Sequence, residues 1–391
     1  MAAEPLSLRP ALADLEARDL KRQRRTVRRG APGTANITLD GRHCVDFCSN
    51  DYLGLSSHPQ VVEAFVAAAR IHGVGARASH LVTGHQAEHE ALEQELAAFT
   101  GRERALVFST GYMANLGLVR ALATRNAAVF GDELNHASLI DGGRLSGAAL
   151  NRYPHADVAA LEQQLAAGPG GPRFVLTDGV FSMDGDLAPL PALAAICARH
   201  GAFLAVDDAH GLGVIGESGR GSLEHFGLSP EEVPALVGTL GKAFGTFGAF
   251  VAGSEELVET LIQRARTYIY TTALPPADAA ATRAALSVSI TEPWRRLRVL
   301  ALTRRFRELA TTAGIRLGIS ETPIQPILLG SAESAMRASN ALLERGFFVA
   351  AIRPPTVPAD TSRLRVTLSA AHRDEDVQGL IAALAKILEP E

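Results

Sequence analysis

The sequence has few cysteines and no long apolar run, and both shortages exclude classes of protein. Its 391 residues include Cys44, Cys48 and Cys197, an odd number that does not suit a disulfide framework and favours buried thiols in a reducing compartment. No stretch of about 18 apolar residues is present, so no membrane-spanning helix is expected. The N-terminal segment also lacks the apolar stretch of a signal peptide. The expected location is therefore the cytoplasm.

The chain also lacks a strong excess of either charge. Its formal net charge is −4, so neither nucleic acid nor an anionic membrane is an expected partner. A local basic run at residues 22–29 is interpreted as a solvated helix end, with a small pocket for an anionic substrate as the alternative.

Lysine is scarce, and one of the few lysines lies in unusual surroundings. Only Lys21, Lys242 and Lys386 are present, and arginine fills the other strongly basic positions. Lysine can lose its proton and become a nucleophilic amine, whereas arginine effectively cannot. Lys242 lies in VGTLGKAFGTFGAF, among small and apolar residues, and Gly241 and Gly245 are expected to give its amine room to move. This lysine is therefore the first candidate for chemistry.

The hydrophobic pattern predicts an α/β protein. An amphipathic helix is expected over LADLEARDLKRQRR, followed by two short strands around residues 40 and 41. From about residue 60, helices alternate with short apolar runs that do not alternate in polarity, which is typical of strands buried in a mostly parallel sheet. The expected strands lie at residues 105–109, 127–131, 173–179, 202–208, 235–240 and 248–253.

The chain is expected to divide into three parts. After residues 272–280 a long helical stretch leads into an α+β pattern that differs from the middle of the chain. The predicted parts are an N-terminal arm with the start of a small domain (1–45), a large α/β domain (46–275) and a smaller C-terminal α+β domain (276–391).

Three motif matches point to chemistry that their context does not favour. GLGVIG at residues 211–216 fits a dinucleotide fingerprint, but ESGRGSLEHFG follows instead of a helix, so a flexible loop is expected. HQAEH at residues 85–89 fits a zinc pattern, yet a solvated His/Glu helix face is the better interpretation, and no metal is predicted. The segment around Lys242 lacks the residues of a phosphate-binding P-loop.

Chemistry-bearing residues follow successive predicted strands. The chain has a Thr-Gly-Tyr helix start after the first strand, then a His, a Ser, an Asp with a His, and finally a Thr with a Lys. Ligands of open parallel sheets bind beyond the carboxyl ends of the strands. A lysine for a Schiff base, an aspartate for a pyridine nitrogen and a helix start for a phosphate are what pyridoxal 5′-phosphate (PLP) requires. We therefore expect a PLP site.

The same segments carry a resemblance to a known family. The motifs are FCSNDYLGL, GYMAN, LNHASLIDG, GVFSMDGD, VDDAHGLGVIGESGRG, TLGKAFG and YTTALPP. Over roughly residues 10–388 the chain resembles the α-oxoamine synthases, which have the aspartate-aminotransferase fold. That resemblance implies a PLP-dependent acyltransferase that condenses an amino acid with an acyl thioester and releases CO2. It also implies a homodimer with shared active sites.

The resemblance implies roles for individual cofactor contacts. Lys242 would hold the cofactor and move the α-proton of the substrate, and His136 would stack on the ring. Asp207 would pair with the pyridine nitrogen, because the D-x-A-H spacing of the family favours it over Asp208. The other implied contacts are Ser182 and His210 at the phenolic oxygen, Gly111, Tyr112 and Thr239 at the phosphate, and Thr271 and Thr272 reaching the phosphate across the dimer.

The resemblance also implies substrates. AIRPPTVP at residues 351–358 is most similar to the family member that joins L-alanine to a pimeloyl group, delivered by CoA or by a carrier protein, in biotin biosynthesis. The implied substrate contacts are Arg22, Asn50, His136, Arg353 and Thr356, with Arg353 as the carboxylate clamp. The alternatives are another pair such as glycine and acetyl-CoA, a nicotinamide-dependent oxidoreductase and a non-catalytic binding protein.

Overall fold

The computed structural model describes residues 8–168 and 170–388 and divides into two compact units. The larger unit comprises Asn50–Ser182 and Asp186–Val299. The smaller unit comprises Met1–Ser49, Met183–Gly185 and Leu300–Glu391. Residues 1–7, the start of the N-terminal segment that lacks the apolar stretch of a signal peptide, lie outside the described residues.

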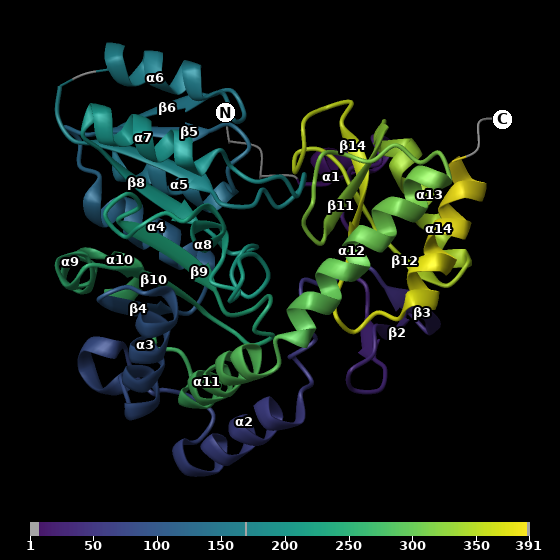
Figure 1. Cartoon of the computed structure of the whole chain (residues 1–391), viewed down its shortest axis with the longest axis horizontal. Helices are drawn as coiled ribbons and strands as arrows, with labels where there is room; N and C mark the ends of the chain where they lie inside the picture. The colour runs from purple at the N-terminus through teal and green to yellow at the C-terminus, as the bar shows by residue number, and fades with distance from the viewer. Residues whose placement is uncertain (1–7, 169, 389–391) are drawn as a thin grey trace, which may run out of the picture. The chain divides into compact units, whose positions relative to one another are not determined.

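The larger unit is built on one sheet with the strand order β4-β10-β9-β8-β7-β5-β6 (Figure 1). Strands β9, β8, β7, β5 and β6 run parallel, and β10 runs antiparallel to both β9 and β4. The bounds are β4 (Arg104–Phe108), β5 (Ala128–Asp132), β6 (Ala149–Tyr153), β7 (Arg173–Asp178), β8 (Ala202–Asp207), β9 (Ala235–Thr239) and β10 (Ala249–Gly253). The predicted mostly parallel sheet is confirmed.

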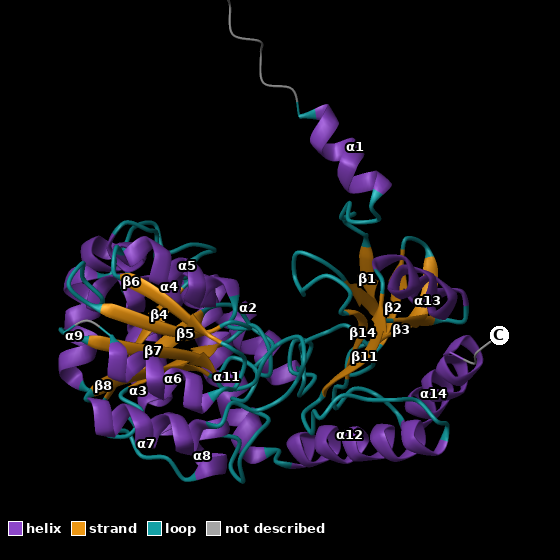
Figure 2. Ribbon diagram, turned by 90° about the horizontal axis from the view of Figure 1, so that it is seen from above, coloured by secondary structure: helices purple, strands orange, loops and turns teal. Residues whose placement is uncertain are grey.

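Helices cover both faces of this sheet, as Figure 2 shows. Side chains of α4, α5 and α9 pack in one buried apolar cluster, and those of α6, α7 and α8 pack in another. The helices of this unit are α2 (Pro59–His72), the short π-helix η1 (His80–Gly84), α3 (Ala87–Thr100), α4 (Gly111–Leu122), α5 (Ala137–Ser146), α6 (Val158–Ala167), α7 (Leu190–His200), α8 (Ser222–Phe226), α9 (Glu255–Arg264), α10 (Arg266–Ile269) and α11 (Pro276–Thr291). Because both sheet faces are covered, the strands carry the unbroken apolar runs seen in the sequence.

The larger unit extends further along the chain than residue 275. Helix α11 packs against α2 and α3, so it belongs to the larger unit, and α12 (Trp294–Thr312) begins there and continues into the smaller one. Composition alone placed a boundary at the proline-rich turn before α11, whereas long-range packing places it at Val299.

The smaller unit combines two small sheets with helices. One sheet has the order β1-β2-β3-β12 and the other β11-β14-β13. The strands on either side of residues 40 and 41 are antiparallel neighbours, as predicted. Its elements are α1 (Arg9–Ala17), β1 (Val27–Arg29), β2 (Asn36–Leu39), β3 (Arg42–Asp46), β11 (Ile324–Gly330), α13 (Ala332–Glu344), β12 (Phe347–Phe348), β13 (Ala350–Ile352), β14 (Ser362–Thr367) and α14 (Asp374–Leu388).

Two elements differ from the sequence-based expectation. Helix α1 is shorter than predicted because Asp19 adopts a left-handed φ of 53°, and Leu20 N–H then bonds back to Leu15 O at 2.8 Å. Strand β6 was not predicted, because it is an edge strand whose polar Asn151 and Arg152 interrupt the apolar run. Within the described ranges, no helix is both long and apolar enough to cross a bilayer.

Candidate active site

The carboxyl ends of the parallel strands bring most of the predicted cofactor residues to one edge of the larger sheet. Asp207 is the last residue of β8 and Thr239 is the last residue of β9. His136 caps α5 just after β5, and Gly111 begins α4 just after β4. The strands before these residues belong to one sheet, so residues far apart in the sequence come to one edge of it.

Lys242 lies at the end of a hydrogen-bonded chain of side chains. Its Nζ is 2.9 Å from His210 Nε2, and His210 Nδ1 is 2.7 Å from the hydroxyl of Tyr52. Tyr52 in turn donates to Asn50 Oδ1 at 3.4 Å. An ammonium group can only donate, so a protonated Lys242 fixes His210 as the Nδ1–H tautomer. This chain holds the lysine amine in one direction.

Asp207 is held by a buried amide that sequence reasoning missed. Asn115 donates from Nδ2 to Asp207 Oδ2 at 2.6 Å and to Ser138 Oγ at 2.8 Å. The backbone N–H of Ala209 donates to the other oxygen of Asp207 at 3.0 Å. Asn115 is the fifth residue of α4, and a polar residue on an otherwise apolar buried face was the available signal.

Asp208 points away from this cluster. It is fully buried, and its Oδ2 accepts a hydrogen bond from Ser222 N–H at 2.6 Å, while its Oδ1 is buried without a partner. Burial raises the pKa of Asp208 to about 7. The family pattern favours Asp207 over the adjacent Asp208. The structure shows that the two side chains point in different directions: Asp207 faces Asn115, and Asp208 faces the loop that follows β8.

The buried Asp208 predicts a pH-dependent stability. Its ordinary pKa is 3.8, so the unfolded carboxyl ionises near pH 4 while the folded one keeps its proton up to about pH 7. The folded state therefore binds more protons, and this group lowers the free energy of unfolding as pH rises from about 4 to 7. We expect the melting temperature of Asp208→Asn protein to change less between pH 4 and pH 8 than that of wild-type protein. The exposed Asp14→Asn is the control, and an equal slope in Asp208→Asn and wild-type protein would contradict the assignment.

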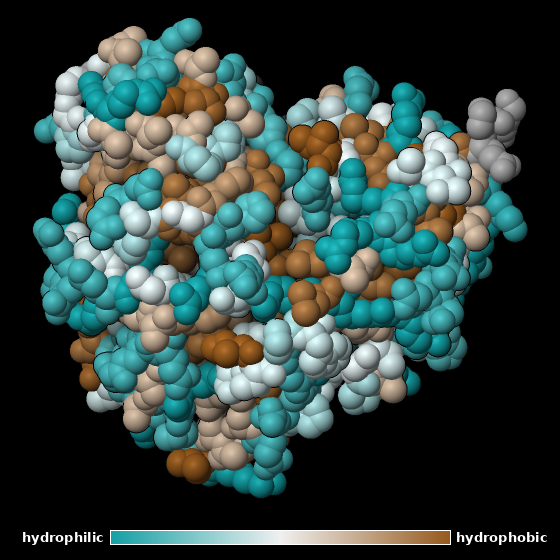
Figure 3. Space-filling model, viewed as in Figure 1, coloured by the Kyte–Doolittle hydropathy of each residue, from teal (hydrophilic) through white to brown (hydrophobic). Residues whose placement is uncertain are grey.

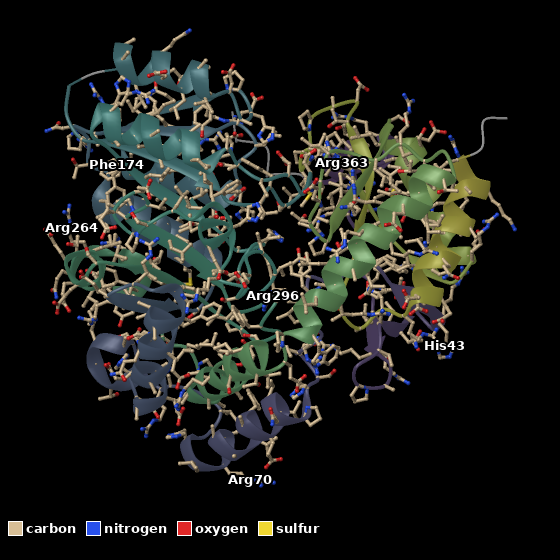
Figure 4. The ribbon with its side chains drawn as sticks, viewed as in Figure 1. His43, Arg70, Phe174, Arg264, Arg296 and Arg363 are labelled. Carbon is tan, nitrogen blue, oxygen red and sulfur yellow. The ribbon has the colours of Figure 1, made fainter. Side chains whose placement is uncertain are left out.

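The GLGVIG segment is a loop without a helix, as predicted, but it is not a flexible one. Residues 211–215 are buried, and the N–H groups of Gly211 and Leu212 both donate to the Asp208 carbonyl at 3.0 Å. Arg296, labelled in Figure 4, is buried and donates to Glu217 O at 2.5 Å, just after this segment. The glycines serve close packing here, since a Cβ at Gly211 would lie 2.1 Å from Asp208 Oδ1.

His136 is an exposed, hydrogen-bonded helix cap. Its backbone N–H donates to Asp178 Oδ2 at 2.9 Å, and its Nδ1 lies 2.7 Å from Ser138 Oγ. Partial desolvation by the neighbouring groups lowers the pKa of His136, although the charge of Asp207 opposes that effect. Burial and the nearby Asp207 both raise the pKa of Asp178. The imidazole is therefore neutral at pH 7, which suits stacking on an aromatic ring.

The first turn of α4 presents backbone donors at the same edge. Thr110 caps the helix by accepting from Met113 N–H at 3.2 Å, and the other N–H groups of a first turn have no intrahelical acceptor. A Cβ at Gly111 would meet no atom within 4 Å, so the helix start is open to a ligand. Tyr112 is exposed and donates to Asp141 at 2.5 Å. An anion such as a phosphate is stabilised at such a position.

The remaining cofactor candidates lie in loops or at a strand end of the larger unit. Ser182 is half-buried in the loop after β7, and Thr239 Oγ1 donates to Gly248 O at 3.2 Å. Thr271 is half-buried and Thr272 is exposed, directly after α10. Their roles stay predictions.

The predicted acyl and carboxylate contacts form a group within the smaller unit. Arg22 donates to Thr356 Oγ1 at 3.1 Å, and Arg353 donates to the carbonyl of Asp19. Burial and the neighbouring charge of Arg22 lower the pKa of Arg353. The two guanidinium groups thus form a local concentration of positive charge, as expected for a carboxylate site.

The interpretation of HQAEH as a solvated helix face was wrong for His89. That side chain is fully buried, its Nδ1 accepts from Gln86 N–H at 3.0 Å, and its Nε2 lies 2.6 Å from Leu274 O. Both ring nitrogens are therefore used in fixing α3. The ligand atoms of His85, Glu90 and Glu93 lie within 4.8 Å of one another, but Glu93 accepts the Val107 N–H at 2.9 Å. Burial raises the pKa of Glu93 to about 8, so it is a poor carboxylate ligand at pH 7.

Of the two glycines beside Lys242, Gly245 has a structural role that the sequence did not indicate. Gly245 has a φ of 68°, and its N–H donates to Lys242 O at 2.9 Å. A Cβ there would lie 2.4 Å from Ser56 N. Gly245 therefore permits a tight turn against Ser56, whereas the neighbouring Gly241 is exposed.

The donor set fits PLP. A lysine amine, a carboxylate, a neutral imidazole and an open helix start lie at one sheet edge, and these are the groups that bind its aldehyde, pyridine nitrogen, ring and phosphate. Asn115 Oδ1 is buried without a hydrogen-bond partner, which leaves one polar atom beside Asp207 unsatisfied.

Comparison with known proteins identifies the class. A model of the family described as aminotransferase class I and II matches residues 42–384. The serine palmitoyltransferase of S. paucimobilis, solved with bound PLP, superimposes with a TM-score of 0.92 at 31% identity, covering 97% of this chain and 96% of that one. The chain belongs to the aminotransferase class I and II family and to its α-oxoamine synthases, and PLP is its cofactor. The predicted fold class is confirmed.

More specific relatives share one name. The chain is 60% identical over 391 residues, and over the full length of both proteins, to the 8-amino-7-oxononanoate synthase of Methylococcus capsulatus. A solved 8-amino-7-oxononanoate synthase from Francisella tularensis matches with a TM-score of 0.76 at 35% identity, covering 88% of this chain and 97% of that one.

Proposed function

We propose that the chain catalyses the 8-amino-7-oxononanoate synthase reaction of biotin biosynthesis. In this reaction L-alanine condenses with pimeloyl-CoA or pimeloyl carrier protein, releasing CO2 and the thiol. The observation that carries this proposal is the 60% identity to a synthase of that name over the full length of both chains. The arrangement of Lys242, Asp207 and His136 supplies the chemistry that such a reaction requires.

The cofactor, when bound, withdraws electrons from the substrate's α-carbon and so makes loss of a proton or of CO2 feasible. Lys242 holds the cofactor and then acts as the base at the α-carbon, with His210 and Tyr52 fixing the direction of its amine. Asp207 keeps the pyridine nitrogen protonated, and Asn115 fixes the orientation of that carboxylate. His136 stacks on the ring and borders the bound substrate.

We assign the phosphate and the phenolic oxygen of the cofactor to different segments of the chain. Gly111 and Tyr112 supply the open start of α4, and the end of β9 supplies Thr239. Ser182 and His210 serve the phenolic oxygen.

We assign the substrate contacts to two groups. Arg353, with its guanidinium close to that of Arg22, clamps a carboxylate, and Thr356 lies beside Arg22 in the acyl site. Asn50, at the far end of the Lys242 chain of hydrogen bonds, borders the amino acid. Because arginine binds carboxylates through two parallel hydrogen bonds, this charge suits pimelate better than an acetyl group.

We further propose a homodimer in the cytoplasm. Large apolar side chains are exposed along α2 and η1, including Ile71 at 77% and Val82 at 74%, and Figure 3 shows brown apolar atoms at the lower end of the larger unit, where α2 lies in Figure 1. Such a face favours burial against a second copy. In that dimer, Thr271 and Thr272 of the partner subunit reach the phosphate. The free state of Cys44, Cys48 and Cys197 suits a reducing compartment.

The substrate pair is tested by thiol release. With L-alanine and pimeloyl-CoA we expect kcat/KM roughly 100-fold above that with glycine and acetyl-CoA, because a site built around arginines discriminates against a substrate that leaves them unpaired. Assays of CoA and CO2 release in parallel measure this ratio. Lys242→Ala protein is the control for non-enzymatic thioester hydrolysis.

Other outcomes would select other functions. Equal or higher activity with glycine and acetyl-CoA would assign the chain to a different family member. Borohydride reduces the imine between a lysine and PLP and so changes its visible absorbance. A spectrum that shows no such absorbance and does not change with borohydride would favour a binding protein or a nicotinamide-dependent enzyme.

A further inference from the structure

His155 lies between two carboxylates at the edge of the sheet that carries the active site. Its Nδ1 is 3.0 Å and 3.2 Å from the two oxygens of Asp132, and its Nε2 is 2.8 Å from Asp186 Oδ2. Asp132 is the last residue of β5, and His155 follows the last residue of β6 by two positions. Both ring nitrogens therefore face acceptors, which requires a doubly protonated imidazole.

The positive charge of the His155 imidazole compensates the negative charges of two buried carboxylates. Asp132 and Asp186 are both buried, and Asp186 Oδ1 has no hydrogen-bond partner. Burial lowers the pKa of His155, but the hydrogen bonds to the two carboxylates outweigh burial and raise it to about 10. Glu133, whose carboxylate accepts the His155 backbone N–H at 3.3 Å, adds a further negative charge nearby. Removing the imidazolium would leave two buried carboxylates without a counter-ion, which is strongly unfavourable.

His155 contacts both residues that close the hairpin at residues 179–188. Phe181 N–H donates to the carbonyl of Asp186 at 3.0 Å, which pairs the two sides of the hairpin. The His155 ring packs edge-on against the Phe181 ring, with centroids 4.4 Å apart and planes at 87°. His155 thus contacts the hairpin at two points: the Phe181 ring just before Ser182, and the Asp186 carboxylate just after the tip.

The tip of the same hairpin is fixed separately. After Ser182, residues 183–185 of the tip belong to the smaller unit, where Gly185 O accepts a hydrogen bond from Ser320 Oγ at 2.9 Å. Arg363, labelled in Figure 4, pairs with Asp184 in that unit. Ser182 is the residue between the part held by His155 and the part held by the smaller unit.

We propose that His155 is a positioning residue of the active site: by bridging Asp132 and Asp186 it fixes the 179–188 hairpin to the end of β5 and sets the position of Ser182. The inference rests on the proposed function, in which Ser182 serves the phenolic oxygen of the cofactor. His155 touches neither cofactor nor substrate in this assignment and acts only through the hairpin.

The test replaces His155 and follows the hairpin directly. In His155→Phe, which keeps a ring against Phe181 but removes both hydrogen bonds, amide hydrogen exchange in residues 179–188 of the cofactor-free protein should be at least about tenfold faster. Exchange in α7 should stay within twofold of wild type, which separates a local effect from global destabilisation. The dissociation constant for PLP, from titration of the lysine-linked absorbance, should rise about tenfold, as expected for lost hydrogen bonds to charged groups.

A second variant and a matched control keep the test decisive. Asp186→Asn conserves shape and one acceptor, so it should fold if His155→Phe does not, and it should move exchange and PLP affinity in the same direction by at least about threefold. His200→Asn is the control, because His200 pairs with Glu162 at 3.8 Å at the end of α7, before β8 begins. Exchange at residues 179–188 and PLP affinity within twofold of wild type in a folded variant would overturn the inference. Failure of wild-type protein to form the lysine-linked chromophore would instead overturn the proposed function.

Discussion

Lys242→Ala protein is expected to lose the lysine-linked visible absorbance of the cofactor and to lose turnover by at least about 10⁴-fold, the upper range for loss of a general base. In the proposed function, the amine 2.9 Å from His210 both attaches the cofactor and moves the substrate proton, and alanine can do neither. Absorbance spectroscopy after saturation with PLP, together with CoA release from alanine and pimeloyl-CoA, measures both losses.

Lys386→Ala is the matched control for this prediction. Lys386 lies exposed on α14 in the smaller unit, so its replacement should leave absorbance and turnover unchanged within twofold. If cofactor-replete Lys242→Ala protein retained wild-type turnover, the assignment of Lys242 would be wrong.

Asp207→Asn should reduce kcat by roughly 10²–10⁴-fold, because removing one partner of a buried ion pair costs about 3–5 kcal/mol. Asparagine conserves the shape beside Asn115 but cannot hold the proton of a pyridine nitrogen, so the cofactor becomes a weaker electron acceptor. The KM for alanine should change much less than kcat. Steady-state kinetics at saturating PLP measures this difference.

Asp208→Asn tests whether that loss belongs to Asp207 alone. The neighbouring carboxyl faces Ser222 N–H instead of Asn115, so its replacement should alter the pH dependence of stability and leave kcat at pH 7 within about threefold of wild type. A 100-fold loss in Asp208→Asn with no loss in Asp207→Asn would reverse the assignment of the two aspartates.

The hydrogen-bonded chain from Lys242 to Asn50 gives the lysine a defined environment before any ligand binds. Tyr52 is 1% exposed and lies between His210 and Asn50, so it couples the position of Asn50 to that of the lysine. Tyr52 was absent from the residues chosen by sequence reasoning, although it lies within the FCSNDYLGL motif.

Much of the fold, and the position of the main candidate residues at one edge of the sheet, followed from the sequence. Strands β4, β5, β7, β8, β9 and β10 were predicted within one or two residues, because strands covered on both faces need unbroken apolar runs. The scarcity of lysine singled out Lys242, and the position of Asp207 after an apolar strand placed it at the ligand-binding edge. The strands and the positions of these two residues depend on which residues follow one another along the chain, so the sequence pattern predicts them.

Tertiary structure alone decided which polar groups meet and which are buried. Tyr52 and His210 are 158 positions apart and share a hydrogen bond, and no local pattern encodes such a pairing. His89 was interpreted as part of a solvated face yet is buried, with its Nε2 2.6 Å from Leu274 O, and α11 joins the larger unit through its packing on α2 and α3. Sequence periodicity specifies which face of an element is apolar, but which distant element covers that face, and which polar atoms it must then satisfy, is fixed only when the whole chain packs.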